Sequence, residues 1–414
     1  MTARRGFPRG RDRGGGILGA VRTATLKPGF AKPLWKGHPW VYADSVATLE
    51  EGTDDLVRVV DATGKAIGRG WLSPASAIRI RLLDRDEEGP PEADLLASRL
   101  EAAVALRDRL VLRGGRTDAC RLVHAEADGI PGLVVDRFGP VLVAQFATRP
   151  VHARRDDLAR RLLALSGATS LLARPGGKEE EEGIPLADVP FAAGTLAPET
   201  VEVREDGVRF LVDLRRGQKT GHYADQRENR RLVGELAAGL DVLDLHAGTG
   251  GFSIHALVAG ARAATAVDSS GPALACARGN AERNEVGGRL EVVEADALDR
   301  LDAWARAKTS FDVIVADPPR FATTRKGLDR ALLAYRRLNA KALARVRPGG
   351  FFATFSCSGA VDPETFGEMV RAAARDAGRD ARLLRVLSAG PDHPVALFAP
   401  EGRYLTGLLL QVLP

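Results

Sequence analysis

The sequence predicts an α/β protein whose C-terminal half is a Rossmann-like sheet, preceded by a β-rich module and an α+β module. From about residue 217, apolar strands alternate with amphipathic helices, which is typical of a parallel sheet covered on both faces. A glycine loop follows the first of these strands, where such sheets bind ligands. At 414 residues the chain is also long enough for two to three domains of about 150 residues each.

Residues 1–20 are predicted to form a flexible basic arm, because Arg4, Arg5, Arg9, Arg11 and Arg13 lie among glycines. No apolar stretch of signal-peptide length follows them, so export is not indicated. An organelle transit peptide is the alternative.

Residues 21–90 are predicted to be the β-rich module, with strands at residues 56–61, 66–71 and 78–83 separated by turn residues. Basic residues are interleaved with Trp35, Trp40, Tyr42 and Trp71, a mixture suited to RNA phosphates and to base stacking. The alternative is that the tryptophans form the core of this small module.

Residues 91–215 are predicted to be the α+β module. A helix is expected over residues 95–112, with Arg107, Asp108 and Arg109 toward solvent, and a second helix over residues 152–165. We expect strands at residues 121–126, 133–136, 141–146 and 170–173, and a hairpin over 201–214 that turns at Asp206 and Gly207. The charged loop at 176–182 is expected to be disordered.

Residues 216–414 are predicted to be the parallel-sheet domain. The strands are expected at residues 241–246, 263–267, 290–294, 311–316, 351–356, 383–387 and 404–412. Helices are expected between them, including residues 271–284, 327–345 and 363–377.

The composition excludes several classes of protein. The hydrophobic fraction is 45%, and no run of about 18 apolar residues suits a membrane span. The three cysteines form no CxxC pair and no HExxH is present, so neither a disulfide framework nor a metal is indicated, and a reducing, cytoplasmic location is expected. A net charge of +5 fits a polyanionic partner without proving one.

The glycine loop predicts S-adenosylmethionine (SAM) as the cofactor. It reads Asp244-Leu245-His246-Ala247-Gly248-Thr249-Gly250-Gly251-Phe252. A dinucleotide site would have a third glycine where this chain has Ser253. Because Asp244 stands just before the loop, a cationic ligand suits it better than a diphosphate. SAM carries an ammonium and a sulfonium and no phosphate.

Two more carboxylates stand at successive strand ends. Asp268 ends the second strand and is expected to accept hydrogen bonds from the ribose hydroxyls. Asp296 follows the third strand and is expected to bind the adenine edge. The alternative is that these aspartates only cap the helices that follow them.

The fourth and fifth strands bring a carboxylate and a thiol to the same sheet edge. Asp317-Pro318-Pro319-Arg320-Phe321 follows the fourth strand, and Ser356-Cys357-Ser358 ends the fifth. Carbon 5 of a pyrimidine accepts a methyl group only after a nucleophile adds to carbon 6, and a thiolate suits that addition. Cys357 is therefore the predicted nucleophile, and Asp317 is expected to hold the base through its exocyclic amine and nitrogen 3.

Cys357 has a simpler alternative as a buried cysteine that packs as a small hydrophobe. A catalytic thiol needs a lowered pKa, and Arg320 and Lys326 are the cations expected to lower it. Cys120 and Cys276 lack comparable neighbours and are expected to be structural.

The polar stretch at residues 217–230, GQKTGHYADQRENR, is too rich in hydrogen-bonding groups for an ordinary linker. It is expected either to line the cofactor or RNA site or to form a helix cap with Asp225 and Glu228. His393 is expected to be a packed loop residue, with a proton shuttle as the alternative.

The chain resembles the large-subunit rRNA cytosine-5 methyltransferases of the RlmI type over nearly its whole length. The likeness rests on His38-Pro39-Trp40-Val41-Tyr42, on residues 125–133 (AEADGIPGL), on residues 217–230, on Asp317 to Phe321, on Ser356-Cys357-Ser358 and on Asp392-His393-Pro394-Val395. The chain departs from the family at His124, where Asn is usual, at Gly248, where Tyr is usual, and in its Arg-rich arm.

The resemblance implies a PUA domain at 21–90, an EEHEE domain at 91–215 and a class I SAM-dependent methyltransferase domain at 216–414, with 5-methylcytidine in rRNA as the product. It also implies Cys357 as the nucleophile. Together with the residues above, it assigns Asp244, Gly248, Gly250, Phe252, Asp268, Ser269, Asp296 and Asp317 to the cofactor, and Lys219, Gln226, Arg227, Pro318 and Phe321 to the RNA. A homodimer is left open.

Two other functions stay open. One is an rRNA methyltransferase of the guanine-N7 type, which needs no thiol because the ring nitrogen is already nucleophilic. The other is a catalytically inactive RNA-binding ribosome assembly factor. Cys357 favours carbon as the acceptor, and the intact Asp244, Asp268 and Asp317 favour an active enzyme.

Overall fold

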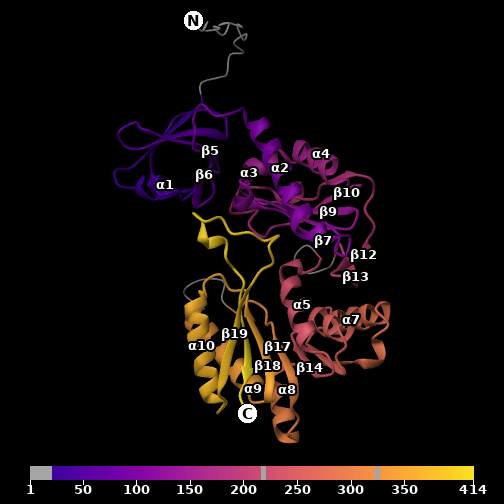
Figure 1. Ribbon diagram of the computed structural model, residues 1–414. Helices are drawn as coiled ribbons and strands as arrows, with labels where there is room; N and C mark the ends of the chain where they lie inside the picture. The colour runs from indigo at the N-terminus through magenta and orange to yellow at the C-terminus, as the bar shows by residue number, and fades with distance from the viewer. Residues whose placement is uncertain (1–20, 216–220, 322–326) are drawn as a thin grey trace, which may run out of the picture. The chain divides into compact units, whose positions relative to one another are not determined.

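The computed structural model describes residues 21–215, 221–321 and 327–414, and Figure 1 labels its helices and strands. The chain divides into two compact units, Met1–Gly89 and Pro90–Pro414. The predicted arm at 1–20 lies outside the described residues. In the part of the chain that the structure describes, we find no helix with the length and apolar character of a membrane span.

The first unit is built on a six-stranded sheet with the order β2-β6-β5-β4-β1-β3. Its elements are β1 (Thr23–Leu26), α1 (Lys32–Trp35), β2 (Trp40–Tyr42), β3 (Val46–Leu49), β4 (Leu56–Val60), β5 (Ala66–Leu72) and β6 (Ile78–Asp84). The three strands predicted from turn residues are present, because alternate residues such as Val57 and Val59 of β4 face one apolar core.

The tryptophans of this unit differ in exposure. Trp71 is 1% exposed and belongs to the core, as the alternative interpretation held. Trp35 at the end of α1 is 46% exposed, and the ammonium of Lys65 lies 4.6 Å from its ring centroid. The exposed ring leaves the predicted contact with RNA open for Trp35.

The second unit begins with an α+β region. Its elements are α2 (Glu92–Arg107), β7 (Ala119–His124), β8 (Leu133–Phe138), β9 (Val141–Phe146), α3 (Arg149–Ala153), α4 (Arg155–Ser166), β10 (Ser170–Ala173), β11 (Ala192–Gly194), β12 (Thr200–Glu205) and β13 (Val208–Asp213). β7 to β11 form a five-stranded sheet with the order β11-β10-β9-β8-β7, and β12 and β13 form the predicted hairpin.

The prediction that Arg107 faces solvent is wrong. The side chain of Arg107 is fully buried, and its guanidinium donates to Asp128 and to the backbone oxygens of Arg121 and Asp392. An arginine at a solvent-facing position of a helical pattern becomes buried when distant parts of the chain supply acceptors for all of its donors.

The loop at residues 176–182 is also more ordered than predicted. Glu179 is 5% exposed, and its carboxylate accepts hydrogen bonds from the backbone of Gly176 and Gly177. Glu182 is 2% exposed. The side chains of these two glutamates are buried, so the negative charge of the loop does not prevent it from packing against the protein.

The C-terminal part of this unit is a seven-stranded sheet with the order β16-β15-β14-β17-β18-β20-β19, in which β20 alone runs antiparallel to β18 and β19. Its elements are α5 (Arg227–Leu236), β14 (Asp241–Leu245), α6 (Gly251–Val258), β15 (Ala263–Asp268), α7 (Gly271–Arg283), β16 (Leu290–Glu294), α8 (Ala297–Ala307), β17 (Phe311–Ala316), α9 (Leu328–Leu343), β18 (Val346–Ser356), α10 (Pro363–Asp376), β19 (Ala381–Ser388) and β20 (Thr406–Val412).

Helices cover this sheet on both faces, as the alternating pattern predicts (Figure 1). One core contains residues of α5, α6 and α7, and the other contains residues of α8, α9 and α10. Neighbouring strand residues alternate between them, since Val242 joins the first core and Leu243 the second. The first core also includes Phe138 and Phe210, so the α+β region and the sheet domain share apolar contacts.

Candidate active site

The crevice at the carboxyl ends of β14 and β17 is where the strand order of the sheet reverses. From β14 the chain moves outward to β15 and β16, and then returns to β17 on the other side of β14. Parallel α/β sheets bind ligands at this switch point. Asp244 near the end of β14 and Asp317 after β17 therefore lie at the edge where a ligand is expected.

The glycine loop turns tightly between β14 and α6. Gly248 and Gly250 have φ angles of +54° and +83°, a conformation that glycine adopts with little strain. A side chain at Gly250 would meet Ala277 and Ile254 at 3.0 Å, whereas Gly248 faces open space. The loop is thus packed at one glycine and open at the other, which leaves room for a ligand beside Gly248.

Asp244 is almost fully buried beneath the loop. Its Oδ2 accepts hydrogen bonds from the backbone nitrogen and the hydroxyl of Ser253, at 3.0 and 2.9 Å. Its Oδ1 is buried, with no hydrogen-bond partner among the described residues. Burial raises the pKa of Asp244 to about 7. The hydrogen bonds from Ser253 lower this pKa, and the negative charge of Asp317 raises it.

Asp268 and Asp296 have different surroundings. Asp268 accepts from the backbone nitrogens of Gly248 and Ser270, both at 2.9 Å, so it ties β15 to the glycine loop. Asp296 caps α8 by accepting from Leu298 and Asp299. The capping alternative therefore describes Asp296. Because its carboxylate is exposed, it can still accept a hydrogen bond from a ligand. Ser269 is exposed beside Asp268.

Phe252 does not face the crevice. It is 4% exposed and packs against Phe355, with ring centroids 5.5 Å apart. The predicted cofactor contact of this residue is thus limited to its backbone at the start of α6.

A buried charged cluster supports the loop from below. Glu205 at the end of β12 accepts from His222, His255 and Arg230 at 2.8 to 3.0 Å. Burial would raise the pKa of Glu205, but Arg230 and the histidines hold it well below its ordinary value. Arg230 lies so close to Gly251 that a Cβ there would approach its Nε to 2.5 Å. The cluster therefore fixes the start of α6.

Cys357 lies directly after β18, beside the segment that follows β17. Its Sγ is 3.9 Å from the carbonyl oxygen of Pro318, and Arg320 donates to the carbonyl oxygen of Cys357 at 3.2 Å. The thiol is only partly buried. The predicted proximity of the thiol to the Asp317 segment is therefore present. Cys357 also packs against the first core as a partly buried side chain, so its alternative role as a small hydrophobe stays open.

Tyr335 of α9 clamps the turn that carries Cys357. Its hydroxyl contacts the hydroxyls of Ser356 and Ser358 at 3.0 and 3.1 Å. Tyr335 is fully buried, and Phe321 packs over it at 4.7 Å between centroids while remaining 38% exposed. Pro318 is buried. Of the residues predicted to bind RNA here, Phe321 is the one with an open surface.

Asp317 is held by the polar stretch before α5. Gln226 donates to Asp317 Oδ2 at 3.0 Å, and Asn229 donates to Gln226 Oε1 at 2.6 Å. Tyr223, next to this pair, is partly exposed. Burial raises the pKa of Tyr223 to about 12, with contributions from the charges of Asp317, Asp225 and Cys357, so its hydroxyl stays protonated close to both predicted catalytic groups.

The capping-box alternative for this stretch is wrong. The residue before α5 is Gln226, with no side-chain cap, and Asp225 lies in a 3-10 turn (Ala224–Gln226) where it accepts from the Tyr404 hydroxyl at 2.7 Å. Lys219 and Lys326 lie outside the described residues.

Arg227 is not available for RNA in this structure. It is 2% exposed, and its guanidinium donates to both oxygens of Asp392 at 2.9 and 3.2 Å. The backbone nitrogen of Arg121 donates to Asp392 as well. Burial would raise the pKa of Asp392, but His393 and Arg227 hold it below its ordinary value. This pair joins α5, β7 and the loop between β19 and β20.

Replacing Arg227 with methionine is expected to destabilise the fold by about 3 kcal/mol, because it leaves the buried carboxylate of Asp392 without its ion-pair partner. Arg231→Met is the matched control one turn later in α5, where the side chain is 51% exposed and pairs with Glu228 and Glu235. The control is expected to cost less than about 1 kcal/mol. Urea unfolding of both variants measures the difference, and equal small losses would contradict the assignment.

Several residues of the site gave no signal that a single sequence could reveal. Tyr335, His255 and Glu205 act through partners 17 to 50 positions away. His246 has a φ of +61° and a buried Nε2 with no hydrogen bond in the described ranges. Its place within the glycine loop was the one available clue.

Cys276 was predicted to be structural but is exposed, whereas Cys120 is buried as expected.

The arrangement leaves space for a cationic ligand beside a buried carboxylate. Among the described residues, no group of three or more His, Cys, Asp or Glu is suited to a metal ion. The buried Oδ1 of Asp244 lacks a partner, and the space beside Gly248 is open. A ligand cation at Asp244 would complete the hydrogen bonding of a carboxylate that burial alone disfavours.

The chain is similar to known methyltransferases. Residues 134–398 match the S-adenosylmethionine-dependent methyltransferase model, and residues 24–85 match the PUA-like domain model. Ribosomal RNA large subunit methyltransferase I of Cronobacter sakazakii is 36% identical over 94% of this chain and 98% of its own length, and that of Shewanella amazonensis is 37% identical over 94% and 98%.

Solved structures share the fold. A candidate SAM-dependent methyltransferase from Streptococcus mutans superimposes with a TM-score of 0.80 at 20% identity, covering 94% of this chain and 100% of its own. A candidate methyltransferase solved in complex with SAH gives a TM-score of 0.81 with the same identity and coverage. The fold is thus a PUA-like domain followed by a methyltransferase domain.

The family model spans most of the two α/β regions, and the curated relatives match along almost their full length. The chain therefore belongs to the S-adenosylmethionine-dependent methyltransferases of the ribosomal RNA large subunit methyltransferase I family.

Proposed function

We propose that this protein methylates carbon 5 of a cytosine in large-subunit rRNA through a covalent adduct with Cys357. The named relatives support rRNA as the substrate. The observation that carries the choice of carbon is the partly buried thiol of Cys357 beside the Asp317 segment, 3.9 Å from the Pro318 oxygen. Methylation of a ring nitrogen needs no thiol.

SAM is proposed to bind at the carboxyl ends of β14 and β17. Asp244 receives the ammonium group, Gly248 and Gly250 allow close approach of the backbone, and Asp268 accepts from the ribose. Asp296, Ser269 and the buried Nε2 of His246 are proposed to contact the adenine. When bound, SAM supplies the electrophilic methyl group.

Cys357 and Asp317 are proposed to act on the base. The thiolate adds to carbon 6, which moves electron density to carbon 5 and makes it nucleophilic. Asp317, oriented by Gln226, accepts hydrogen bonds from the base, and Tyr223 offers a protonated hydroxyl nearby. With SAM bound, carbon 5 would take the methyl group as the methyl–sulfonium bond breaks and S-adenosylhomocysteine leaves. Loss of the carbon 5 proton to a base would then let the bond between carbon 6 and sulfur break, which restores the thiolate and the aromatic ring.

The target base must leave its stack to reach Cys357, at a cost of about a few kcal/mol. Phe321 is exposed at the crevice and is proposed to contact the displaced base. The PUA-like unit, with Trp35 and Lys65 at its surface, is proposed to contribute RNA contacts that offset this cost.

SAM affinity is expected to rise with pH between about 6 and 8. Because burial raises the pKa of Asp244 to about 7, the carboxyl is largely neutral at pH 6 and must release a proton when the ammonium binds. Below this pKa the affinity should fall about tenfold per pH unit. Calorimetry at pH 6 in buffers of different ionisation enthalpy measures the released proton. An affinity that is flat from pH 6 to 8 would exclude this role for Asp244.

The proposed function is tested by nucleoside analysis of rRNA incubated with the protein and SAM carrying a labelled methyl group. Labelled 5-methylcytidine is the expected product, and a labelled N-methylguanine would refute the choice of carbon.

A further inference from the structure

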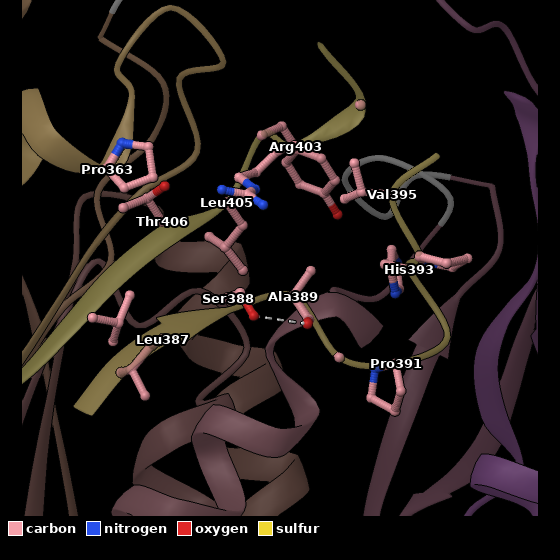
Figure 2. Close-up of a pocket in the computed structure, with 15 residues that line it drawn as sticks. Pro363, Leu387, Ser388, Ala389, Pro391, His393, Val395, Arg403, Leu405 and Thr406 are labelled. Atoms are coloured by element: carbon pink, nitrogen blue, oxygen red, sulfur yellow. Dashed lines mark hydrogen bonds between the residues drawn. The ribbon is translucent and has the colours of Figure 1, made fainter. Parts of the chain in front are cut away.

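A cavity of about 420 Å³ opens between the end of β19, the start of β20 and the loop that connects them. Figure 2 shows His393 and Val395 on one wall, Arg403 and Leu405 above, and Ser388 and Ala389 at its floor. Its volume is in the range of sites that hold a small ligand. None of the groups assigned so far to the cofactor or to the reaction lines it.

The strand register places this cavity beside the thiol and away from the cofactor crevice. Ser356 pairs with Thr406, and Thr406 pairs with Ser388, so the ends of β18, β20 and β19 lie side by side. Cys357 follows Ser356, and two strand spacings of roughly 5 Å separate it from the cavity floor. β17 and β18 stand between the cavity and β14, where the glycine loop begins.

The walls of the cavity combine aliphatic groups with a histidine ring and an arginine. Val395 and Leu405 supply apolar surface, and Arg403 is exposed at the rim. His393 is 5% exposed, and its Nδ1 lies 3.4 Å from Asp392 Oδ1, which holds the ring beside that carboxylate. Unpaired RNA bases are bound by this kind of surface, with ring stacking, hydrogen bonds at the base edge and an arginine near the phosphate.

The cavity is also connected to the reaction site by hydrogen bonds. Asn229 donates to the carbonyl oxygen of Ser388 at 3.0 Å and to Gln226 at 2.6 Å, and Gln226 donates to Asp317 at 3.0 Å. The buried pair of Arg227 and Asp392 holds the loop that carries His393. The walls are therefore fixed in place before a ligand arrives, and they share a support with Asp317.

We propose that this cavity binds an unpaired nucleotide that neighbours the target base in the RNA substrate. The inference rests on the proposed RNA substrate and adds a second base-binding site to it. Because the sites are close, holding a neighbour in the cavity would keep the target base displaced over Cys357.

Filling the cavity tests this directly. Val395→Trp is expected to raise KM for an rRNA fragment about tenfold, the loss typical of one stacked base, while kcat and the affinity for SAM stay within about twofold. Leu397→Trp is the matched control, two residues further on, because that side chain is 91% exposed and does not line the cavity. Arg403→Gln, an exposed change with no effect expected on folding, should also raise KM.

Photo-crosslinking separates this inference from the proposed function. An rRNA fragment carrying 4-thiouridine is irradiated with the full-length protein and SAM, and the crosslinked peptides are mapped. Crosslinks within residues 388–406 that disappear in Val395→Trp but persist in Leu397→Trp support the cavity. Crosslinks near Phe321 and Cys357 with none in 388–406 overturn the inference and leave the function standing. The absence of both crosslinks and methylation overturns the proposed function, and the inference with it.

Discussion

Cys357→Ala is expected to reduce methyl transfer to rRNA by at least about 1,000-fold, because removal of a covalent nucleophile eliminates the reaction path that depends on it. The affinity for SAM should be unchanged, since Cys357 follows β18 and the glycine loop follows β14. Single-turnover transfer from labelled SAM measures the rate, and equilibrium binding measures the affinity.

Cys276→Ala is the matched control for this variant. Cys276 is the exposed cysteine of α7, so the same chemical change is made far from the predicted acceptor base. It should retain full activity. A second readout uses RNA with 5-fluorocytidine, whose fluorine cannot leave as a proton does, so the adduct should stall. A complex that survives denaturation is expected with the wild type and with Cys276→Ala but not with Cys357→Ala.

Asp244→Asn is expected to weaken SAM binding by about 100-fold, since loss of a buried charge opposite a ligand cation typically costs about 3 kcal/mol. The same change should stabilise the cofactor-free protein at pH 7.5. Burial raises the pKa of Asp244 in the folded protein to about 7. The stability that Asp244 contributes is therefore fully present below the pKa of the unfolded chain, and it is lost as the pH rises through the pKa of the folded protein. An amide carries no charge and avoids that loss. Calorimetric binding and thermal unfolding together measure both effects.

Asp241→Asn is the control on the same strand. Asp241 begins β14, at the opposite end from the glycine loop, and accepts from Arg262 and Arg347. The hydrogen bonds from Arg262 lower the pKa of Asp241, although burial acts in the opposite direction. Removal of this charge should therefore reduce stability slightly and leave SAM binding intact. If Asp244→Asn also destabilised the protein while retaining SAM affinity, Asp244 would be a structural residue only.

The residues that the sequence could predict are those whose role follows from local position. Asp244, Asp268 and Asp317 stand at strand ends, and the period of the apolar pattern places the strands to within a few residues. Because parallel strands of one sheet align their carboxyl ends, order along the chain was enough to bring Cys357 near the Asp317 segment.

The errors have a common physical cause. A local sequence pattern assigns charged residues to the surface or to a ligand. The fold instead buries three of them against acceptors or donors that it supplies: Arg107, Arg227 and Glu179. The partners of Arg107 and Arg227 in the loop after β19 lie 285 and 165 positions away. Asp225 failed as a cap for the same reason, since Tyr404 binds it from 179 positions away.

Prediction of the site was limited in the same way. Tyr335 clamps both serines that flank Cys357, but nothing in the α9 pattern distinguishes it from a core aromatic residue. Phe252 follows the glycine loop directly, yet the helical turn directs its ring into the core against Phe355. Neighbourhood in sequence identifies a loop that binds a ligand, and the fold decides which of its side chains face it.

The most direct test of the central claim is nucleoside analysis of large-subunit rRNA methylated by the wild type and by Cys357→Ala with labelled SAM. Labelled 5-methylcytidine with the wild type, absent with Cys357→Ala, is the result predicted by a thiolate that adds to carbon 6. Methylation that persists without Cys357, or a label found on a base nitrogen, would contradict that mechanism.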